Sequence, residues 1–189
     1  MIRSERAPTL AFRERETTQA AAYLVKRAGG RLNYTKLLKL LYLADRTLLV
    51  RYGKPITYDQ WVSMRHGPVL SRTYDLIKTP ESGGYWARHL ATDGYDAVMR
   101  EDPGSDDLSP AAVQVLEEVY EQFGGLDTWA VRDVAHDLPE WADPGNTAHP
   151  ITYRSVLEVE GFGQEEVDAI LENIEAQDAL DRLIAATRR

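Results

Sequence analysis

The chain has 189 residues, of which 43% are hydrophobic and 28% charged, a composition typical of one ordinary globular domain. It has no cysteine, which excludes disulfides, thiolate nucleophiles and thiolate zinc sites. No stretch of about 18 apolar residues could span a bilayer, and the charged first residues lack the apolar segment of a signal peptide. We therefore expect a cytoplasmic protein that does not insert into a membrane.

Charge is unevenly distributed along the chain. Residues 1–100 carry 17 Lys and Arg against 9 Asp and Glu, whereas residues 101–143 carry 1 against 12. The basic residues are scattered, without a basic run or interleaved aromatic residues, so nucleic-acid binding is disfavoured. The acidic segment instead fits a basic protein partner.

A polar segment, residues 1–16, precedes the first predicted helix. Thr17 or Thr18 is suited to cap the start of that helix, and Gly29 with Gly30 is suited to end it. The Ala-rich sequence between them favours helix formation.

The second predicted helix has a capping residue at its start and a stop signal at its end. Asn33 is suited to cap its start, and Gly53 followed by Pro55 is suited to end it. The apolar residues between Leu37 and Leu49 occupy more than one helical face. We therefore expect this helix to be buried on several sides and to form the centre of the fold.

The next stretch contains the sequence Arg-His-Gly-Pro. Residues 60–64 are rich in aromatic and β-branched side chains and too few for a helix, so they predict an extended segment. Pro68 fixes its own φ and disfavours α geometry at Gly67, so we expect Pro68 to start a helix running from Val69 to Lys78.

The remaining elements are predicted from turns and caps. Asp93 and Gly94 lie between two short runs and indicate a hairpin, which we expect to be the only sheet. Three further helices are predicted: from Ser109 with Pro110 to Gly124, from Asp127 to about Leu138, and a short one within residues 151–161.

The last predicted helix is amphipathic. Acidic residues in its first turn and arginines in its last turn agree with the helix dipole. Its apolar stripe docks either on the core or on another chain, and the sequence leaves both interpretations open. The stripe consists of Val167, Ile170, Leu171, Ile174, Leu180, Leu183 and Ile184.

These elements predict a mainly α fold, a compact helical domain around a central buried helix with one small β-hairpin or short antiparallel sheet. We expect residues 1–16 to be a polar segment, residues 17–160 to form the helical domain, and residues 161–189 to form the terminal amphipathic helix.

No catalytic constellation is visible in the sequence. The chain has no phosphate-binding loop, no dinucleotide-binding glycine pattern and no nucleophile elbow. Asp133, His136 and Glu140 have the spacing of metal ligands on a helix, but Pro139 ends the helix before the third ligand. His66 is interpreted as a structural or binding residue, since no partner that would orient a general base lies nearby. We expect no enzyme activity, no cofactor and no metal.

The aromatic residues favour a binding role. The chain has 4 tryptophans and 10 tyrosines but only 3 phenylalanines, so most rings combine apolar area with a polar group. Trp61, Trp86, Trp129 and Trp141 each lie near the edge of a predicted element. Such residues serve either as core or as anchors for a partner.

Two stretches resemble the Panacea domain family. The first runs from Lys36 to Tyr74; its matching positions include Lys39, Leu40, Leu41, Tyr42, Tyr52, Gly53, Lys54, Pro55, Trp61, Gly67, Pro68 and Val69. The second has a His, a Pro and a Trp, matched by His136, Pro139 and Trp141. Two positions depart from the family pattern: His66 replaces a frequent Tyr, and Glu140 separates Pro139 from Trp141.

The resemblance implies an antitoxin that neutralises a cognate protein toxin, encoded by the adjacent gene, through stoichiometric binding as in type II toxin–antitoxin pairs. It also implies a role in phage defence. One branch of the family delivers its toxin to a protease, which is an alternative function. A metal-dependent hydrolase using His136 and a DNA-binding autorepressor using Lys36 and Lys39 remain further alternatives, and homo-oligomers are possible.

The candidate site residues form two sets. We expect the partner to contact Trp61, Arg65, His66, Tyr74, Trp86 and Trp141. We expect a structural role for Lys36, Leu40, Tyr42, Gly53, Pro55, Gly67, Pro68 and His136.

Overall fold

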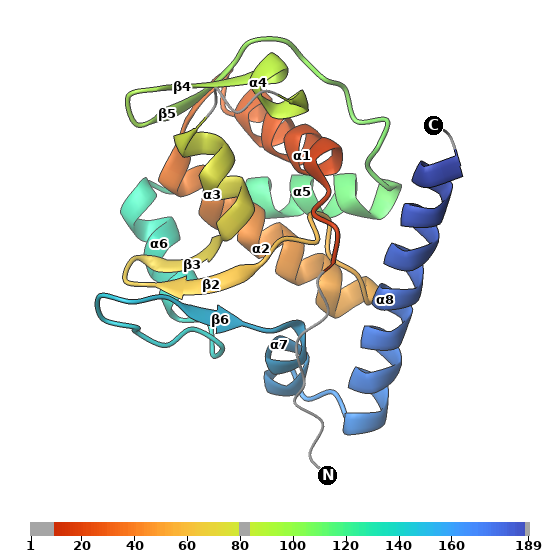
Figure 1. Cartoon of the computed structure of the whole chain (residues 1–189). Helices are drawn as coiled ribbons and strands as arrows, with labels where there is room; N and C mark the ends of the chain where they lie inside the picture. The colour runs from red at the N-terminus through yellow and green to blue at the C-terminus, as the bar shows by residue number, and fades with distance from the viewer. Residues whose placement is uncertain (1–9, 80–83, 188–189) are drawn as a thin grey trace.

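The computed structural model describes residues 10–79 and 84–187 (Figure 1). Within these residues the chain forms eight helices and six strands. The helices are α1 (Glu14–Arg27), α2 (Tyr34–Tyr52), α3 (Ser71–Lys78), α4 (Tyr85–His89), α5 (Pro110–Phe123), α6 (Thr128–His136), α7 (Tyr153–Val159) and α8 (Gln164–Thr187). The strands are β1 (Arg31–Asn33), β2 (Trp61–Met64), β3 (Gly67–Leu70), β4 (Leu90–Asp93), β5 (Asp96–Met99) and β6 (His149–Ile151). The mainly α class is confirmed.

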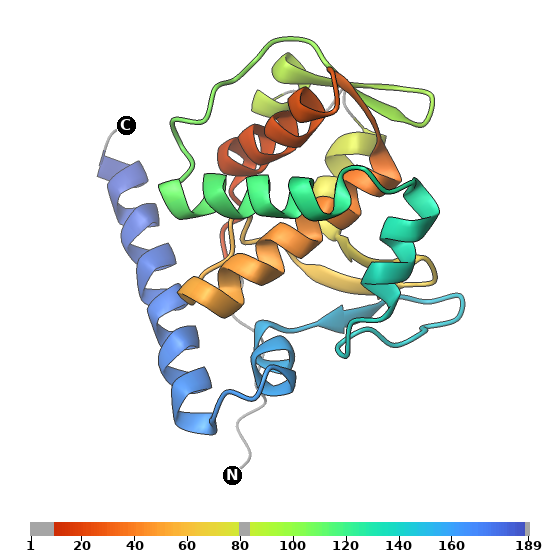
Figure 2. The same cartoon turned by 180° about the vertical axis from the view of Figure 1, so that it is seen from behind.

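Helix α2 contacts α1, α3, α5, α6 and α7 as well as strands of both sheets. Seen from behind, it crosses the molecule beneath α5 (Figure 2). Its start is capped by Asn33, whose side chain accepts hydrogen bonds from the amides of Thr35 and Lys36. Its end is Gly53, which has a left-handed φ of 70°. Most of its side chains are buried because neighbouring elements cover several of its faces.

The strands form two antiparallel sheets, so the expectation of a single sheet is wrong. The predicted hairpin is present as β4–β5, and β1 extends it into a sheet of order β1-β5-β4. The second sheet has the order β3-β2-β6 and lies beside α6 and α7 (Figure 1). The sequence missed this second sheet because β6 pairs with β2 from a distant part of the chain.

Pro68 lies in a strand and does not start a helix, which corrects the prediction. It pairs with Ser63 in the β2–β3 hairpin, and the following helix, α3, begins only at Ser71. Strand β3 is at the edge of its sheet, where a residue without an amide hydrogen is tolerated. The Arg65-His66 dipeptide is therefore the turn of this hairpin.

The first helix also begins earlier than predicted. Helix α1 starts at Glu14, so Thr17 and Thr18 lie inside it and are buried. Thr18 is not a cap, because its hydroxyl donates to the carbonyl oxygen of Glu14 at 2.7 Å. The predicted stop is confirmed: the helix ends at Arg27, just before Gly29 and Gly30.

The caps predicted for α5 and α6 are confirmed. Ser109 accepts a hydrogen bond from the amide of Ala112. Asp127 accepts hydrogen bonds from the amides of Trp129 and Ala130. Helix α6 ends at His136, shortly before Pro139 breaks the helical pattern.

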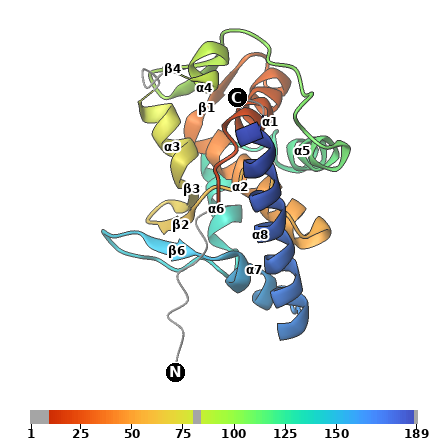
Figure 3. The ribbon, with the colours of Figure 1, turned by 45° about the vertical axis from the view of Figure 1, so that its right-hand side comes forward.

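Helix α8 lies along one side of the molecule, next to α7 (Figure 3). Val167 and Ile174 are buried in the core, whereas Leu180, Leu183 and Ile184 are 52%, 64% and 41% exposed. The arginines predicted for its last turn, Arg188 and Arg189, lie outside the described residues. In residues 10–79 and 84–187, no helix is both long and apolar enough to cross a membrane.

Candidate functional site

The two sequence stretches singled out above meet in space. Helix α6 contacts both α2 and β3, which brings His136 and the segment after it against the β2–β3 hairpin. We call the hairpin, the adjacent part of α2, α6 and residues 137–142 the hairpin face. All of its elements lie within residues 36–142.

Lys39 on α2 ties that helix to the hairpin. It is 1% exposed, and its ammonium group donates to the carbonyl oxygen of Pro68 at 2.7 Å. Burial, followed by the nearby Arg132 cation, lowers the pKa of Lys39 from 10.5 to about 7. Pro68, in the edge strand β3, therefore provides the hydrogen-bond acceptor for this buried amine.

Gly67 is required by its surroundings. It has a φ of 93°, in the left-handed region that side chains disfavour. A Cβ there would lie 2.8 Å from Cδ2 of His136 and 3.1 Å from Nζ of Lys39. Helix α2, the hairpin and α6 therefore meet at a point where only glycine fits.

His136 and Trp141 close the other side of this contact. Their rings stack with centroids 4.1 Å apart, and the Trp141 indole nitrogen donates to the carbonyl oxygen of Met64 at 3.1 Å. Burial lowers the pKa of His136, and the cations Arg132 and Lys39 lower it further. Among the described residues, the buried Nε2 atom of His136 has no hydrogen-bond partner.

Glu140, a departure from the family pattern, is a buried anchor. Its fully buried carboxylate accepts from the Tyr42 hydroxyl at 2.8 Å and from two nitrogens of Arg46 at 2.7 and 3.1 Å. Arg46 also pairs with Glu160, so one cation joins two later segments to α2. Burial raises the pKa of Tyr42 well above its ordinary value, and the Glu140 charge adds to this effect.

Two buried carboxylates hold the segment that leads into the hairpin, and the sequence reasoning missed both. Asp45 accepts from the amides of Ile56 and Thr57, the Thr57 hydroxyl and the Trp61 indole nitrogen. Burial raises its pKa to about 6, against the effect of these hydrogen bonds. Asp59 accepts from the first amides of α3 and from the Thr73 hydroxyl, and burial raises its pKa too. For Asp45, the sequence offered one signal of this role: it is an acidic residue inside the leucine-rich helix.

The outer surface of the hairpin face contains a concavity of about 270 Å³, which we call the hairpin pocket. The surface of its lining is mainly apolar and aromatic, and four basic side chains border it. The members used below are Lys39, Arg65, His66 and Arg132, together with Tyr34, Tyr74 and Trp129. No Asp or Glu lines the pocket among the described residues.

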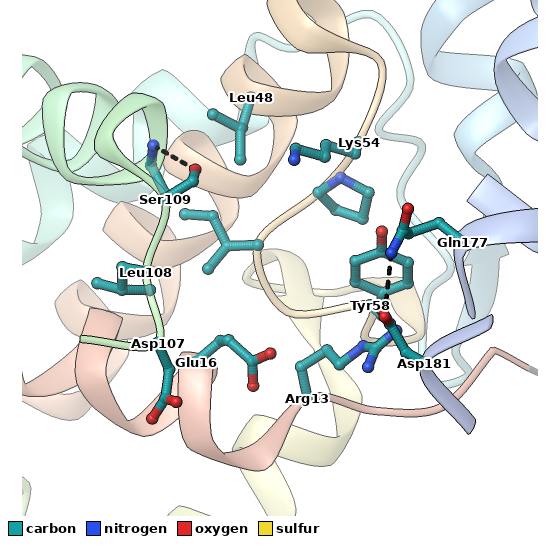
Figure 4. Close-up of a pocket in the computed structure, with 13 residues that line it drawn as sticks. Arg13, Glu16, Leu48, Lys54, Tyr58, Asp107, Leu108, Ser109, Gln177 and Asp181 are labelled. Atoms are coloured by element: carbon teal, nitrogen blue, oxygen red, sulfur yellow. Dashed lines mark hydrogen bonds and ion pairs between the residues drawn. The ribbon is translucent and has the colours of Figure 1, made fainter. Parts of the chain in front are cut away.

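A second concavity, of about 230 Å³, lies where α8 approaches α1, α2 and the start of α5 (Figure 4). Arg13, Asp107 and Asp181 in its lining are already paired. Arg13 contacts Asp181 at 2.8 Å and Asp178 at 3.4 Å, and its guanidinium lies over the Tyr58 ring. These contacts attach α8 to the start of α1, so we interpret this concavity as a structural junction.

The predicted partner-contact residues fall into two groups. Arg65 and His66 are exposed on the hairpin turn, and Tyr74 and Trp141 are partly buried beside it. Trp61 and Trp86 are only 2% and 1% exposed, which corrects their assignment as partner contacts. They belong to the core; the Trp61 ring lies edge-on to the Tyr42 ring.

One surface residue was not among the predicted contacts. Trp129 is 63% exposed at the start of α6, and Arg132 lies over its ring at 4.9 Å. Its position two residues after the Asp127 cap, in the first turn of the predicted helix, was the available signal. We add Trp129 to the candidate site.

The candidate metal ligands diverge in the structure. Asp133 pairs with Arg132, Glu140 points to Arg46, and His136 stacks on Trp141. In the part of the chain that the structure describes, no group of three His, Asp or Glu side chains could hold a metal ion.

The acidic segment interacts with the basic half of the same chain. Five of its carboxylates pair with cations from α1 and α2: Asp102 with Lys26, Asp107 with Arg15, Glu117 with Arg27, Glu118 with Arg51 and Glu140 with Arg46. This pairing reduces the negative field that the segment can offer to a partner. Electrostatic steering of a basic toxin by this segment therefore remains a prediction, and the internal pairing weakens the argument for it.

The fold and site define a mainly helical domain that presents an apolar and aromatic pocket, bordered by basic side chains, next to a β-hairpin. Residues 37–142, more than half of the chain, match the family model described as antitoxin SocA-like, Panacea domain. The chain belongs to this family, which supports a general antitoxin role. No curated protein and no solved structure matches it.

Proposed function

We propose that the protein is an antitoxin that binds a cognate protein toxin directly and stoichiometrically, as in type II toxin–antitoxin pairs. The toxin would be encoded by the adjacent gene, and the pair would act in phage defence in the cytoplasm. The observation that carries the proposal is the convergence of the family residues on one face. Lys39, Gly67 and His136 meet at the hairpin, and Lys39, Arg65 and Trp129 line the hairpin pocket.

The toxin would dock on this face. Exposed tryptophan and arginine side chains are enriched among residues that dominate binding energy, and concave surfaces allow them to be desolvated. Trp129, Arg65 and Arg132 offer such groups around the hairpin pocket. A toxin bound here would have its active site covered or distorted.

Growth of cells that express the adjacent gene, alone and together with this protein, tests the proposal. We expect growth arrest that this protein relieves, and co-purification of the two chains in a one-to-one ratio. Trp129→Ala should weaken the complex by about 30-fold, because truncating an interface anchor costs roughly 2 kcal/mol. Tyr52→Ala is the matched control, since Tyr52 is an exposed ring remote from the pocket lining. A harmless neighbour that forms no complex would refute the proposal.

A second candidate is a proteolysis adaptor, which needs one surface for the toxin and another for the protease. The exposed apolar residues Leu180, Leu183 and Ile184 on α8 are separate from the hairpin pocket and favour this alternative. Toxin levels that fall in the presence of this protein, and recover in a protease-deficient strain, would support it. The same α8 surface could serve a homo-oligomer instead, which the mass of the isolated protein in solution would reveal.

The two lysines that would contact DNA in the autorepressor alternative are engaged within the protein. Lys36 donates to the carbonyl oxygens of Gly124 and Leu126, and Lys39 is buried, so both are committed within the fold. Neither lysine is positioned to neutralise a phosphate of DNA.

A further inference from the structure

The basic residues that line the hairpin pocket differ from those of α1 in their surroundings. Arg13 in the other concavity, and the basic residues of α1 that face the acidic segment, already contact carboxylates. The hairpin pocket instead gathers Lys39, Arg65, His66 and Arg132 without a carboxylate in its lining, as far as the described residues show. Asp133 pairs with Arg132 from outside this lining.

Lys39 is the most deeply buried of these groups, at 1% exposed. An ammonium group has three hydrogens to donate, and the structure gives Lys39 a single acceptor, the carbonyl oxygen of Pro68, among the described residues. Burying such a group without a counter-charge is unfavourable, which agrees with its pKa of about 7. A carboxylate in the pocket would supply both the counter-charge and the missing acceptors.

A second unsatisfied polar atom lies beside Lys39. A Cβ on Gly67 would be 3.1 Å from Nζ of Lys39 and 3.3 Å from Nε2 of His136, so both nitrogens border the same small volume. This Nε2 atom is buried and has no partner in residues 10–79 and 84–187. His136 is not part of the pocket lining, so a carboxylate bound there would act on Lys39 and not on this nitrogen.

The size and walls of the pocket point to an amino-acid residue of a protein as the occupant. At about 270 Å³ the pocket is below the roughly 300–1,000 Å³ of sites that enclose drug-sized ligands. Its walls add Leu38, Met64 and Val69 to the rings of Tyr74 and Trp129, which suits an acidic residue flanked by apolar neighbours. An extended nucleic acid would need an open basic surface instead.

We infer that the hairpin pocket accepts the carboxylate of an acidic side chain of the partner protein, with Lys39 as the buried counter-ion. The inference rests on the proposed function for the identity of the partner. It concerns one carboxylate and therefore holds for a toxin of any net charge. Arg65 and Arg132 bind at the rim, and Trp129 covers the aliphatic part of the bound residue.

Three short peptides test the inference on the full chain without the toxin. The first is acetylated and amidated Ala-Leu-Glu-Leu-Ala, the second carries Gln in place of Glu, and the third is acetylated Ala-Leu-Gln-Leu-Ala with a free carboxyl terminus. Binding is followed by the indole resonance of Trp129, assigned with a Trp129→Phe variant. We expect the Glu peptide to bind about tenfold more tightly than the neutral one, the usual scale of a charge-assisted hydrogen bond. Tighter binding of the peptide with the free carboxyl terminus than of the Glu peptide would overturn the assignment to an acidic side chain.

Variants assign the effect to the pocket. Lys39→Met should abolish the discrimination, and Arg65→Gln, at an exposed position that tolerates substitution, should reduce it in a chain that remains folded. Lys54→Met is the matched control, since Lys54 lines the other concavity and should leave the discrimination intact. The wild-type melting temperature serves as the folding check for each variant.

Equal binding of the charged and neutral peptides, absence of binding by all three, or discrimination that survives both pocket variants would overturn the inference. Tighter binding of inorganic phosphate than of either carboxylate peptide would also overturn it, in favour of a phosphate site. Failure of the proposed function is recognised separately, because the adjacent gene product would then form no complex while the peptide result stands on its own.

Discussion

The hairpin face and helix α8 are both candidate partner surfaces, but they are attached to the core in different ways. Buried polar contacts hold the hairpin face, among them Lys39 to Pro68 and Tyr42 to Glu140. Helix α8 is held by a few apolar side chains and by the pairing of Arg13 with Asp178 and Asp181, and its outer half exposes leucines. The hairpin face is therefore a preorganised surface, whereas α8 adds an apolar surface that the core does not use.

The largest expected effect comes from removing the buried anchor of the hairpin face. Glu140→Ala should lower the free energy of unfolding by about 3–5 kcal/mol, because it leaves Arg46 and Tyr42 without their buried acceptor. Urea denaturation measures the change. Glu158→Ala is the control; its ion pair with Arg154 is long and half exposed, so a change within about 0.5 kcal/mol is expected. Similar small losses for both variants would mean that Glu140 is no anchor.

Two variants of α8 test whether its buried side chains, and not its exposed ones, hold it to the core. Ile174→Ala should cost about 2–4 kcal/mol, since its side chain is 2% exposed, whereas Leu183→Ala should change stability by less than about 0.5 kcal/mol. Thermal or urea unfolding of the two variants gives the answer. A large cost at Leu183 would contradict the exposed position of the outer half of α8.

The burial of Lys39 predicts a pH dependence of stability. Its folded pKa, about 7, lies below the ordinary 10.5, so the unfolded chain binds more protons between these values. The stability contribution of this site therefore rises with pH across that window, by about 2 kcal/mol between pH 7.5 and 9. Arg132 and His136 are the charged or titratable groups closest to it.

Lys39→Met, which retains the approximate length of the side chain, should remove this rise. The free energies of unfolding of both proteins, measured by urea denaturation at several pH values, provide the comparison. Parallel pH profiles for wild type and variant would show that Lys39 keeps its proton in the folded chain.

The smallest predicted difference concerns two glycines with the same backbone conformation. Gly67 and Gly30 both have a φ of 93°, but a Cβ at Gly30 meets nothing within 4 Å. Gly67→Ala should therefore cost about 1–2 kcal/mol more than Gly30→Ala, the part caused by crowding against His136. Equal losses would indicate that backbone strain alone requires Gly67.

The sequence predicted the elements whose signals are local. Asn33, Gly53, Ser109 and Asp127 act at the helix ends where they were placed, because caps and stops depend on neighbouring backbone groups. Pro68 was misassigned because proline suits both the first turn of a helix and an edge strand. Only the pairing of β3 with β2 decides between these, and it depends on tertiary contacts.

The candidate site was predicted in part. The exposed turn at Arg65 and His66 follows from the sequence, but the burial of Trp61 depends on Asp45, which accepts its indole hydrogen. The approach of Lys39 to Gly67 and His136 joins three segments that are distant in the chain. No periodicity or spacing encodes such a contact, so the pocket itself could not be predicted.

The most direct test of the account compares toxin binding by two variants that break the two surfaces separately. One carries Arg65→Glu and Trp129→Ala on the hairpin face, and the other carries Leu180→Ser and Leu183→Ser on α8; both positions in each pair are exposed, so both proteins should fold. The measurement is the amount of adjacent-gene product that co-purifies with each. The account predicts loss of the complex for the hairpin variant and its retention for the α8 variant. A complex lost only with the α8 variant would contradict it.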